Sequence, residues 1–277
     1  MRLLVIDGSN LLFQMFFGMP SKILGKSGKD VRGVVGFVGA LLRIIRLTSP
    51  THICVLFDGE SHNPRVDLSL DYKANRPDWS EMSDEENPFT QEDDIYKAID
   101  YLGIPRYVTE DCEADDIVAA YAANFPGEVI ISSQDSDFFQ LISPRVKVLR
   151  YRGDNSVICD CEYIKNKLGV LPSQYADYKS LVGDSSDNIK GVRGIGPKTA
   201  AKLISDYGSL EGIINNIDSI EKPKIKEALL LDAKRLLLNQ ELITLGYSHK
   251  LPYVFSELSY SLPVVSSGEI LRSIGIF

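Results

Sequence analysis

Two short apolar runs that each end in an aspartate constrain the fold more than any other feature of the chain. Residues 2–6 read RLLVI and precede Asp7, and residues 53–57 read ICVLF and precede Asp58. Runs of this length without alternation are typical of buried strands in a parallel sheet. Between them, residues 33–47 carry apolar side chains at helical spacing, so the chain opens with a β-α-β unit.

The remaining apolar patterns extend this unit into an α/β domain that is followed by a helical region. We expect further strands at 129–132 and 146–151, and helices at 91–102, 113–124, 173–183, 197–208 and 222–245. The pattern predicts a domain over residues 1–170 and a second over 171–277. We expect the last thirty residues, which are rich in serine and tyrosine, to pack back on the protein as a tail.

A polar segment over residues 60–93 interrupts these patterns. It contains three prolines, begins with basic residues and continues with acidic ones. A polar segment this long within a compact domain is typically functional or disordered. Lys73 and Arg76 lie three residues apart in it, and they would share one face if this part is helical. The plainer alternative is two solvated charges.

Nine carboxylates in five clusters mostly follow or join the apolar runs. Because parallel strands deliver their carboxyl ends to one edge of a sheet, we expect the clusters to converge there. Converging carboxylates repel one another in a low dielectric, and divalent cations relieve this repulsion. The pattern therefore predicts an oxygen-ligand metal site rather than acid–base catalysis alone. The nine are Asp7, Asp58, Glu113, Asp115, Asp116, Asp135, Asp137, Asp184 and Asp187.

Each cluster taken alone also fits a surface turn, because aspartate and glycine are common turn formers. Their number and order, with a glycine-rich motif directly after the last cluster, favour a shared site. Within CEADDIVAA, Glu113 and Asp116 are three residues apart and share a helix face. Asp115 points elsewhere, toward a different ion or a second layer of partners.

The sharpest local motif is GVRGIGPKTAAKLI at residues 191–204. Its glycines allow a tight turn with exposed backbone, and Pro197 suits the first turn of a helix. Free N–H groups at that helix start favour an anion, here a phosphate. This helix–hairpin–helix pattern holds nucleic-acid backbone without reading bases. The alternative is a simple connection between helices that uses glycine for its geometry.

Composition limits the compartment and the cofactor. The net charge of −8 argues by itself against a nucleic-acid partner, but two bound divalent ions would halve it. Cys159 and Cys161 have no second pair, so we expect reduced thiols rather than zinc. Apolar runs are too short for a membrane span, and only four apolar residues precede Asp7, too few for a signal peptide. We expect a cytoplasmic monomer.

In their order along the chain, these motifs resemble the bacterial and phage 5′-3′ exonuclease and flap endonuclease family, which includes the N-terminal nuclease domain of bacterial DNA polymerase I. The resemblance covers about residues 2–215, and every acidic position of the pattern is filled. The motifs are VIDGSN, LFDGE, YKANRP, CEADDIVAA, SSQDSDFFQL and GDSSDNIKGVRGIGPKTAAKL. The resemblance implies a PIN-like α/β nuclease core, a helical arch at about 60–93 and a helix–three-turn–helix region that binds duplex DNA.

The resemblance also implies roles for individual residues and two Mg²⁺ ions, for which Mn²⁺ can substitute. The first ion's ligands would be Asp7, Asp58, Glu113, Asp115 and Asp116. The second ion's ligands would be Asp135, Asp137, Asp184 and Asp187. The implied catalytic residues are Lys73, Arg76, Asp7 and Asp135. The implied DNA contacts are Tyr72, Lys73, Arg76, Gly194, Gly196, Lys198 and Thr199. A potassium ion at the hairpin would involve Ser185 and carbonyls near Val192 and Ile195.

The expected activity is a structure-selective 5′ nuclease that hydrolyses DNA at free 5′ ends, nicks and 5′ flaps during replication and repair. RNA–DNA primers are further candidate substrates. Two ions about 4 Å apart would activate a water and stabilise the leaving oxygen. One departure from the family is acidity in the arch, from Asp78 to Glu86 and again over 92–94. Because no polymerase-like sequence follows, we expect a stand-alone nuclease.

Two other classes of protein compete with this interpretation. A DNA-junction-binding module that keeps the fold but lacks catalysis would be missing carboxylates, and none is missing here. A PIN-type ribonuclease is usually shorter and lacks the hairpin region, so residues 172–246 argue against it. Cleavage of DNA and RNA 5′ flaps would separate these classes.

Overall fold

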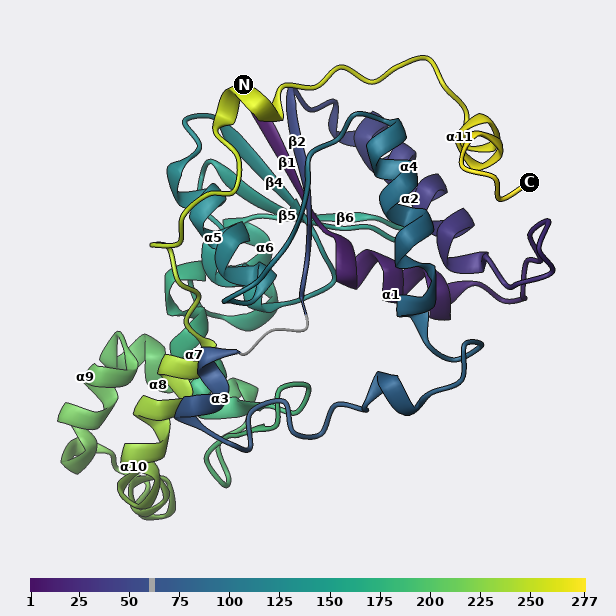
Figure 1. Cartoon of the computed structure of the whole chain (residues 1–277). Helices are drawn as coiled ribbons and strands as arrows, with labels where there is room; N and C mark the ends of the chain where they lie inside the picture. The colour runs from purple at the N-terminus through teal and green to yellow at the C-terminus, as the bar shows by residue number, and fades with distance from the viewer. Residues whose placement is uncertain (60–62) are drawn as a thin grey trace.

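The centre of the protein is a twisted six-stranded sheet with helices on both faces (Figure 1). The structure is a computed structural model and describes residues 1–59 and 63–277. The strand order is β3-β2-β1-β4-β5-β6, and every pairing is parallel except that of β6 with β5. The strands are β1 (Arg2–Asp7), β2 (His52–Phe57), β3 (Arg106–Val108), β4 (Glu128–Ser132), β5 (Val146–Arg150) and β6 (Val157–Cys159).

The two faces of β1 explain why its sequence shows no alternation. Leu3 and Val5 point into one hydrophobic cluster, and Leu4 and Ile6 point into another. All four are fully buried, because helices cover both faces of the sheet. The helices of the Leu4 side are α1 (Gly8–Gly18), α2 (Arg32–Thr48), α4 (Glu92–Tyr101) and α11 (Ser267–Ser273), and those of the Leu3 side are α5 (Ala114–Asn124) and α6 (Cys161–Leu168).

A helical region follows the sheet, as the sequence predicts, with one short hairpin inside it. Its helices are α7 (Tyr175–Val182), α8 (Pro197–Tyr207), α9 (Leu210–Asn215) and α10 (Pro223–Ile243), and its hairpin pairs β7 (Gly183–Asp184) with β8 (Ile189–Lys190). Among the described residues no helix is long and apolar enough to cross a membrane.

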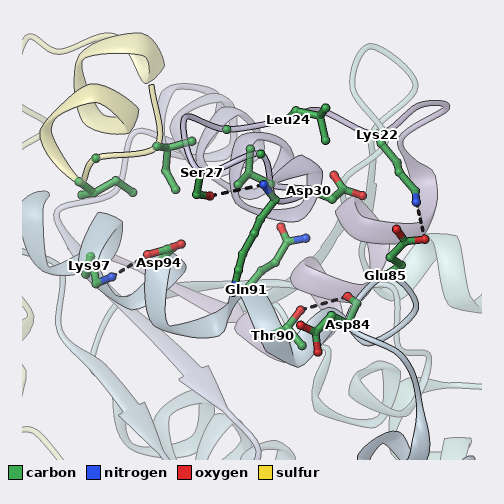
Figure 2. Close-up of a pocket in the computed structure, with 17 residues that line it drawn as sticks. Lys22, Leu24, Ser27, Asp30, Asp84, Glu85, Thr90, Gln91, Asp94 and Lys97 are labelled. Carbon is green, nitrogen blue, oxygen red and sulfur yellow. Dashed lines mark hydrogen bonds and ion pairs between the residues drawn. The ribbon is translucent and has the colours of Figure 1, made fainter.

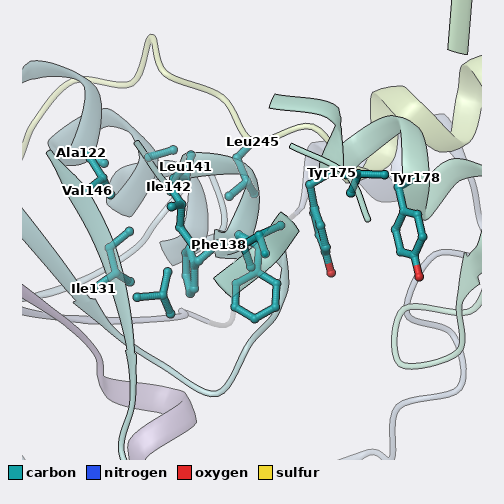
Figure 3. Close-up of a cluster of buried hydrophobic side chains, with 14 of the residues drawn as sticks. Ala122, Ile131, Phe138, Leu141, Ile142, Val146, Tyr175, Tyr178 and Leu245 are labelled. Carbon is teal, nitrogen blue, oxygen red and sulfur yellow. The ribbon is translucent and has the colours of Figure 1, made fainter. Parts of the chain in front are cut away.

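The helical region and the sheet share one hydrophobic core. Figure 3 shows Ile131 of β4 and Phe138 in the same cluster as Tyr175 and Tyr178 of α7. The rings of Phe139 and Tyr175 also meet edge to face, with centroids 5.6 Å apart. This continuous apolar contact fixes the helical region against the end of β4, which is the edge where the carboxylates lie.

Residues 63–93, the described part of the expected arch, are less helical than the resemblance implies. Before α4 begins at Glu92, they contain only α3 (Pro64–Leu68), η1 (Trp79–Glu81) and η2 (Pro88–Gln91), joined by turns. Each short helix starts at an Asn or Asp whose side chain accepts a backbone N–H, and two have proline in the first turn. These residues favour repeated helix starts over a long helix. Residues 60–62 lie outside the described residues.

The expectation that the last thirty residues pack back as a tail is confirmed. Tyr260 N–H donates to the Thr51 carbonyl at 2.9 Å, and the Tyr253 hydroxyl donates to the Arg106 carbonyl at 2.6 Å. Beyond them, α11 packs against α2 through the Leu4-side cluster. In Figure 1 this yellow segment runs from the helical region along the sheet to the far side of the molecule.

Candidate metal and DNA site

The carboxyl edge of the sheet brings the first acidic residues together. Asp7 ends β1, Asp58 follows β2 and Asp135 follows β4, and β1 lies between the other two strands. Asp7 caps α1 by accepting the Asn10 N–H at 3.0 Å, and Asp58 accepts the Ala114 N–H at 2.9 Å. The second contact anchors the start of α5 at this edge, which places Asp115 beside the strand ends.

The electrostatics of these groups show how closely they converge. Burial, and then the charge of Asp58, raise the pKa of Asp7 to about 7. Burial raises the pKa of Asp115 well above its usual range, and Asp135, Asp58 and Asp7 raise it further. Asp115 therefore lies among carboxylates from three strand ends, apart from the face that Glu113 and Asp116 share.

A second acidic group joins the sheet to the helical region. Asp137 at the start of η3 (Asp137–Leu141), Asp184 of β7 and Asp187 each offer an oxygen within 4.8 Å of the others. Burial, and then Asp135, raise the pKa of Asp137 to about 7. Asp137 Oδ1 is buried without a hydrogen-bond partner among the described residues. Clustered, oxygen-only ligands with an unsatisfied buried oxygen fit a hard divalent cation.

Lys179 of α7 is a site residue that the sequence did not reveal. Its ammonium contacts Asp184 and lies 3.4 Å from Asp137 Oδ1. Burial lowers the pKa of Lys179, but the charges of Asp137 and Asp184 outweigh burial, so the pKa is raised and the side chain is cationic. The only signal was its place five residues before Asp184, which does not distinguish it from other lysines.

The YKANR segment lies between the two acidic regions, in a turn rather than on a helix. Lys73 has a positive φ of 56°, its ammonium contacts Glu113, and it lies 4.0 Å from Asp187 Oδ2. Arg76 donates to Asp187 Oδ1 at 2.9 Å, and the Tyr72 hydroxyl donates to Glu113 at 3.2 Å. Burial lowers the pKa of Lys73, but Glu113 and Asp187 raise it more, so the net shift is upward.

Glu113 and Asp116 meet Arg65, a residue of α3 that sequence reasoning also missed. Arg65 Nη1 donates to both carboxylates at 2.8 Å, and Nη2 donates to Asp116 Oδ1 at 2.7 Å. Both oxygens of Asp116 are thus engaged by one guanidinium. This geometry favours a positioning role for Asp116, and its role as a metal ligand stays a prediction.

The glycine-rich motif forms an exposed turn on a buried anchor. Val192 and Ile195 are buried, whereas Gly194, Gly196 and Lys198 are exposed. Gly194 has a φ of 84°, which L side chains rarely adopt, and Gly196 caps α8 with no side chain. The first N–H groups of α8 are therefore open to an anion. The DNA and potassium roles predicted here stay predictions.

One pocket lies away from these groups. It has a volume of about 510 Å³, and its walls come from residues 22–31, 84–97 and 274–276 (Figure 2). Two ion pairs bound it, Lys22 with Glu85 at 2.5 Å and Lys97 with Asp94 at 2.7 Å. None of the nine carboxylates lines it, so the acidic residues define a separate site.

Two solved structures share this fold. The structure is similar to bacteriophage T5 5′-exonuclease with bound zinc, with a TM-score of 0.73, 23% identity, and coverage of 88% of this chain and 89% of that one. It is also similar to the catalytic core of Rad2 in complex with DNA, with a TM-score of 0.59, 17% identity, and coverage of 98% and 91%. These two likenesses show the fold, and the carboxyl edge of its sheet carries the acidic site described above.

Sequence comparison identifies the family. Residues 2–169 match the 5′-3′ exonuclease N-terminal resolvase-like domain, and residues 170–264 match the 5′-3′ exonuclease C-terminal SAM fold. The chain belongs to the 5′-3′ exonuclease family. It is 34% identical over 255 residues to DNA polymerase I of Lactococcus lactis and 35% identical over 277 residues to that of Mycobacterium leprae. These matches cover 88% and 98% of this chain but only 28% of each relative.

Proposed function

We propose that the protein is a structure-selective nuclease that cleaves DNA at 5′ flaps, nicks and free 5′ ends. One observation carries this proposal: oxygens of Asp137, Asp184 and Asp187 lie within 4.8 Å of one another, and Arg76 donates a hydrogen bond to Asp187. Carboxylates from the sheet and from the helical region thus join at one place. Arg76 contacts this group of carboxylates, and a phosphodiester would be held beside it.

Two divalent ions, Mg²⁺ or Mn²⁺, fit the oxygen-only ligand set. One would use Asp7, Asp58 and Asp115 with Glu113, and the other Asp135, Asp137, Asp184 and Asp187. When bound, such ions lower the pKa of a water and offset charge on the phosphate oxygens. The raised pKa values of Asp7 and Asp137 support this assignment, because a cation would favour their ionised forms.

The cationic side chains would act on the phosphate directly. Lys73 and Arg76 sit on the turn between α3 and η1 and reach Asp187 from the same side. Because Glu113 and Asp187 hold the pKa of Lys73 above its usual value, Lys73 is protonated at neutral pH and can offset charge that develops on the phosphate. Tyr72 donates to Glu113 and orients that carboxylate.

Duplex DNA would be held by the turn at 191–196 and the open start of α8. Gly194, Gly196, Lys198 and Thr199 would contact phosphates, and a potassium ion at Ser185, Val192 and Ile195 would bridge to the backbone. Contacts of this kind fix register and carry little base preference. Binding should therefore weaken as salt rises, with little dependence on sequence.

A labelled 5′-flap substrate tests this function. The protein should cut near the junction with Mg²⁺ or Mn²⁺ and stop with EDTA. Asp135→Asn with Asp137→Asn should abolish cleavage and preserve DNA binding. Asp100→Asn, which removes an exposed partner of Arg106, is the control that should cut normally.

Three outcomes would contradict the proposal in different ways. A clean preparation that binds flaps but never cuts them would indicate a junction-binding module. Normal cleavage by the double variant would show that the second ion's ligands are wrong. Cleavage of RNA flaps alone would indicate a ribonuclease, whereas cleavage of both DNA and RNA flaps would agree with primer removal.

A further inference from the structure

Arg65 uses every donor of its guanidinium, and its partners come from two separate parts of the protein. Toward the sheet, Nη1 and Nη2 donate to Glu113 and Asp116. Toward the helical region, Nε donates to the Leu242 carbonyl at 3.0 Å and Nη2 donates to the Thr244 carbonyl at 3.1 Å. An arginine has five N–H groups in a fixed plane, and these five contacts account for all of them. The residue is 9% exposed.

The helix that Arg65 holds supports the other half of the acidic site. Leu242 lies in the last turn of α10 and Thr244 caps it. Further back on α10, Asn239 donates to the Ser180 and Lys190 carbonyls at 3.2 and 2.9 Å, and Arg235 donates to the Gly191 carbonyl at 3.1 Å. These contacts hold α7 just before the hairpin that carries Asp184 and Asp187, the last residue of that hairpin, and the first residue of the turn at 191–196.

We propose that Arg65 is a positioning residue that sets Glu113 in register with the helical region, and thereby couples DNA contact at the turn over 191–196 to divalent-ion binding at the acidic site. The inference rests on the proposed function. The physical path is continuous: the turn joins α10 through Arg235, α10 joins Arg65 through its last carbonyls, and Arg65 joins Glu113.

Close packing around the hairpin keeps this path stiff. A side chain at Gly183 would place its Cβ 2.4 Å from the Gly191 backbone nitrogen, so the two backbones touch at the base of the hairpin. The path ends at Glu113, and both oxygens of its carboxylate accept hydrogen bonds. Glu113 receives hydrogen bonds from Arg65, Asn63 and Tyr72, so its orientation follows from α3 and its neighbours. A displacement of α10 would therefore move Arg65 and turn Glu113.

Arg65→Lys tests this role, because lysine keeps the charge but loses the planar fork. Arg106→Lys is the matched control, since Arg106 also makes a two-point contact with an aspartate, Asp100, at 2.9 and 3.2 Å, on an exposed surface. Mn²⁺ binding is measured from the electron paramagnetic resonance signal of free Mn²⁺. It is measured alone and with a covalently closed DNA dumbbell, which has no 5′ end to cut. DNA binding is measured separately in EDTA.

In the wild-type protein, the dumbbell should tighten Mn²⁺ binding about 10-fold. Arg65→Lys should weaken Mn²⁺ binding about 10- to 100-fold and reduce the DNA effect below about 2-fold, with DNA affinity in EDTA nearly unchanged. Arg106→Lys should match the wild type. The inference is overturned if Arg65→Lys keeps both the Mn²⁺ affinity and the DNA effect. It is also overturned if DNA affinity falls as much as Mn²⁺ affinity.

Asp116→Asn supplies a second test if Arg65→Lys does not fold. It removes the charge of the carboxylate that accepts from both Nη atoms of Arg65, and it should likewise reduce the effect of DNA on Mn²⁺ binding. Where both variants fold, the double variant should lose no more than the worse single variant, because both changes break one linkage. Multiplicative losses would overturn the inference. A wild-type protein that neither binds Mn²⁺ nor cuts flaps would instead refute the proposed function itself.

Discussion

Two pairs of carboxylates in this protein have the same sequence spacing and opposite surroundings. Glu113 and Asp116 lie three residues apart at the start of α5, and Asp184 and Asp187 lie three residues apart in the β7–β8 hairpin. Arg65 takes both oxygens of Asp116 and one of Glu113, whereas Asp184 and Asp187 turn toward Asp137. One guanidinium contacts both residues of the first pair, whereas in the second pair Arg76 contacts Asp187 alone and both carboxylates lie close to Asp137.

The difference shows that spacing alone does not decide what a carboxylate does. On α5, the pair faces α3 and the end of α10, where a planar cation fits between them. In the hairpin, Ser186 and Lys179 hold Asp184 and Arg76 holds Asp187, and an oxygen of each carboxylate also lies within 4.8 Å of one on Asp137. The surrounding elements therefore favour a positioning role for Asp116, and the metal-ligand role of Asp187 stays a prediction.

The largest expected effect separates the two pairs directly. Asp187→Asn should slow flap cleavage about 10³-fold, because it removes a ligand charge at the reacting centre. Its midpoint of unfolding in EDTA should stay level or rise, since like charges are removed. Asp116→Asn should slow cleavage only about 10- to 100-fold, with a lower midpoint of unfolding. Single-turnover rates and urea unfolding measure both, and equal losses of rate would contradict the distinction.

Removal of the Lys73 ammonium, which contacts Glu113 and lies near Asp187, should have the next largest effect. Lys73→Ala should slow single-turnover cleavage about 10²-fold, because its charge is needed most as charge develops on the phosphate. The dissociation constant for flap DNA should change much less. Lys97→Ala, which removes an exposed lysine paired with Asp94, is the control. An effect of Lys73→Ala confined to DNA affinity would refute its assigned role.

The buried carboxylates of the acidic site should make stability depend on pH in EDTA. Burial raises the pKa of Asp7 and of Asp137 to about 7, from an ordinary value of 3.8. A carboxyl group with a raised pKa in the folded state stabilises that state at low pH, and this contribution is lost as pH rises through the folded pKa. The urea midpoint should therefore fall from pH 5 to pH 8, and Mg²⁺ should restore it. A midpoint that rises with pH would contradict the assigned shifts.

The smallest expected effect lies at the glycine-rich turn, where Lys198 is exposed. Lys198→Ala should weaken DNA binding a few-fold at all sequences and lower the salt slope by about one unit. Lys202→Ala on the same helix is the control, because Lys202 is paired with Asp206. Fluorescence anisotropy over a range of salt measures both variants. An unchanged salt slope for Lys198→Ala would remove it from the DNA contacts.

Much of the architecture could be predicted from the sequence. Burial of neighbouring residues leaves a pattern in the local sequence. It produces the unbroken apolar runs of β1 and β2 and the helical spacing of apolar residues in α2 and α5. Patterns of this kind predicted β1, β2, β4 and β5 with α2 and α5, including the strands that Asp7 and Asp58 end or follow. The short β3 and β6 carry no such pattern, because three residues are too few to show one.

Contacts between distant segments could not be predicted in the same way. Arg65 precedes Glu113 by 48 residues and Leu242 by 177, and nothing in the local sequence links them. Lys179 shows the same limit, since its partner Asp137 comes from another domain of the family. In the described part of the expected helical arch the helices are short for a local reason: repeated Asn, Asp and Pro residues start new helices.

Anomalous scattering from Mn²⁺-loaded crystals would test the central claim most directly. The account predicts a strong peak within coordination distance of oxygens of Asp137, Asp184 and Asp187, at a concentration of Mn²⁺ that supports flap cleavage. It predicts no peak between Glu113 and Asp116 on the side that Arg65 occupies. A fully occupied ion there, with none at Asp137, Asp184 and Asp187, would contradict the account.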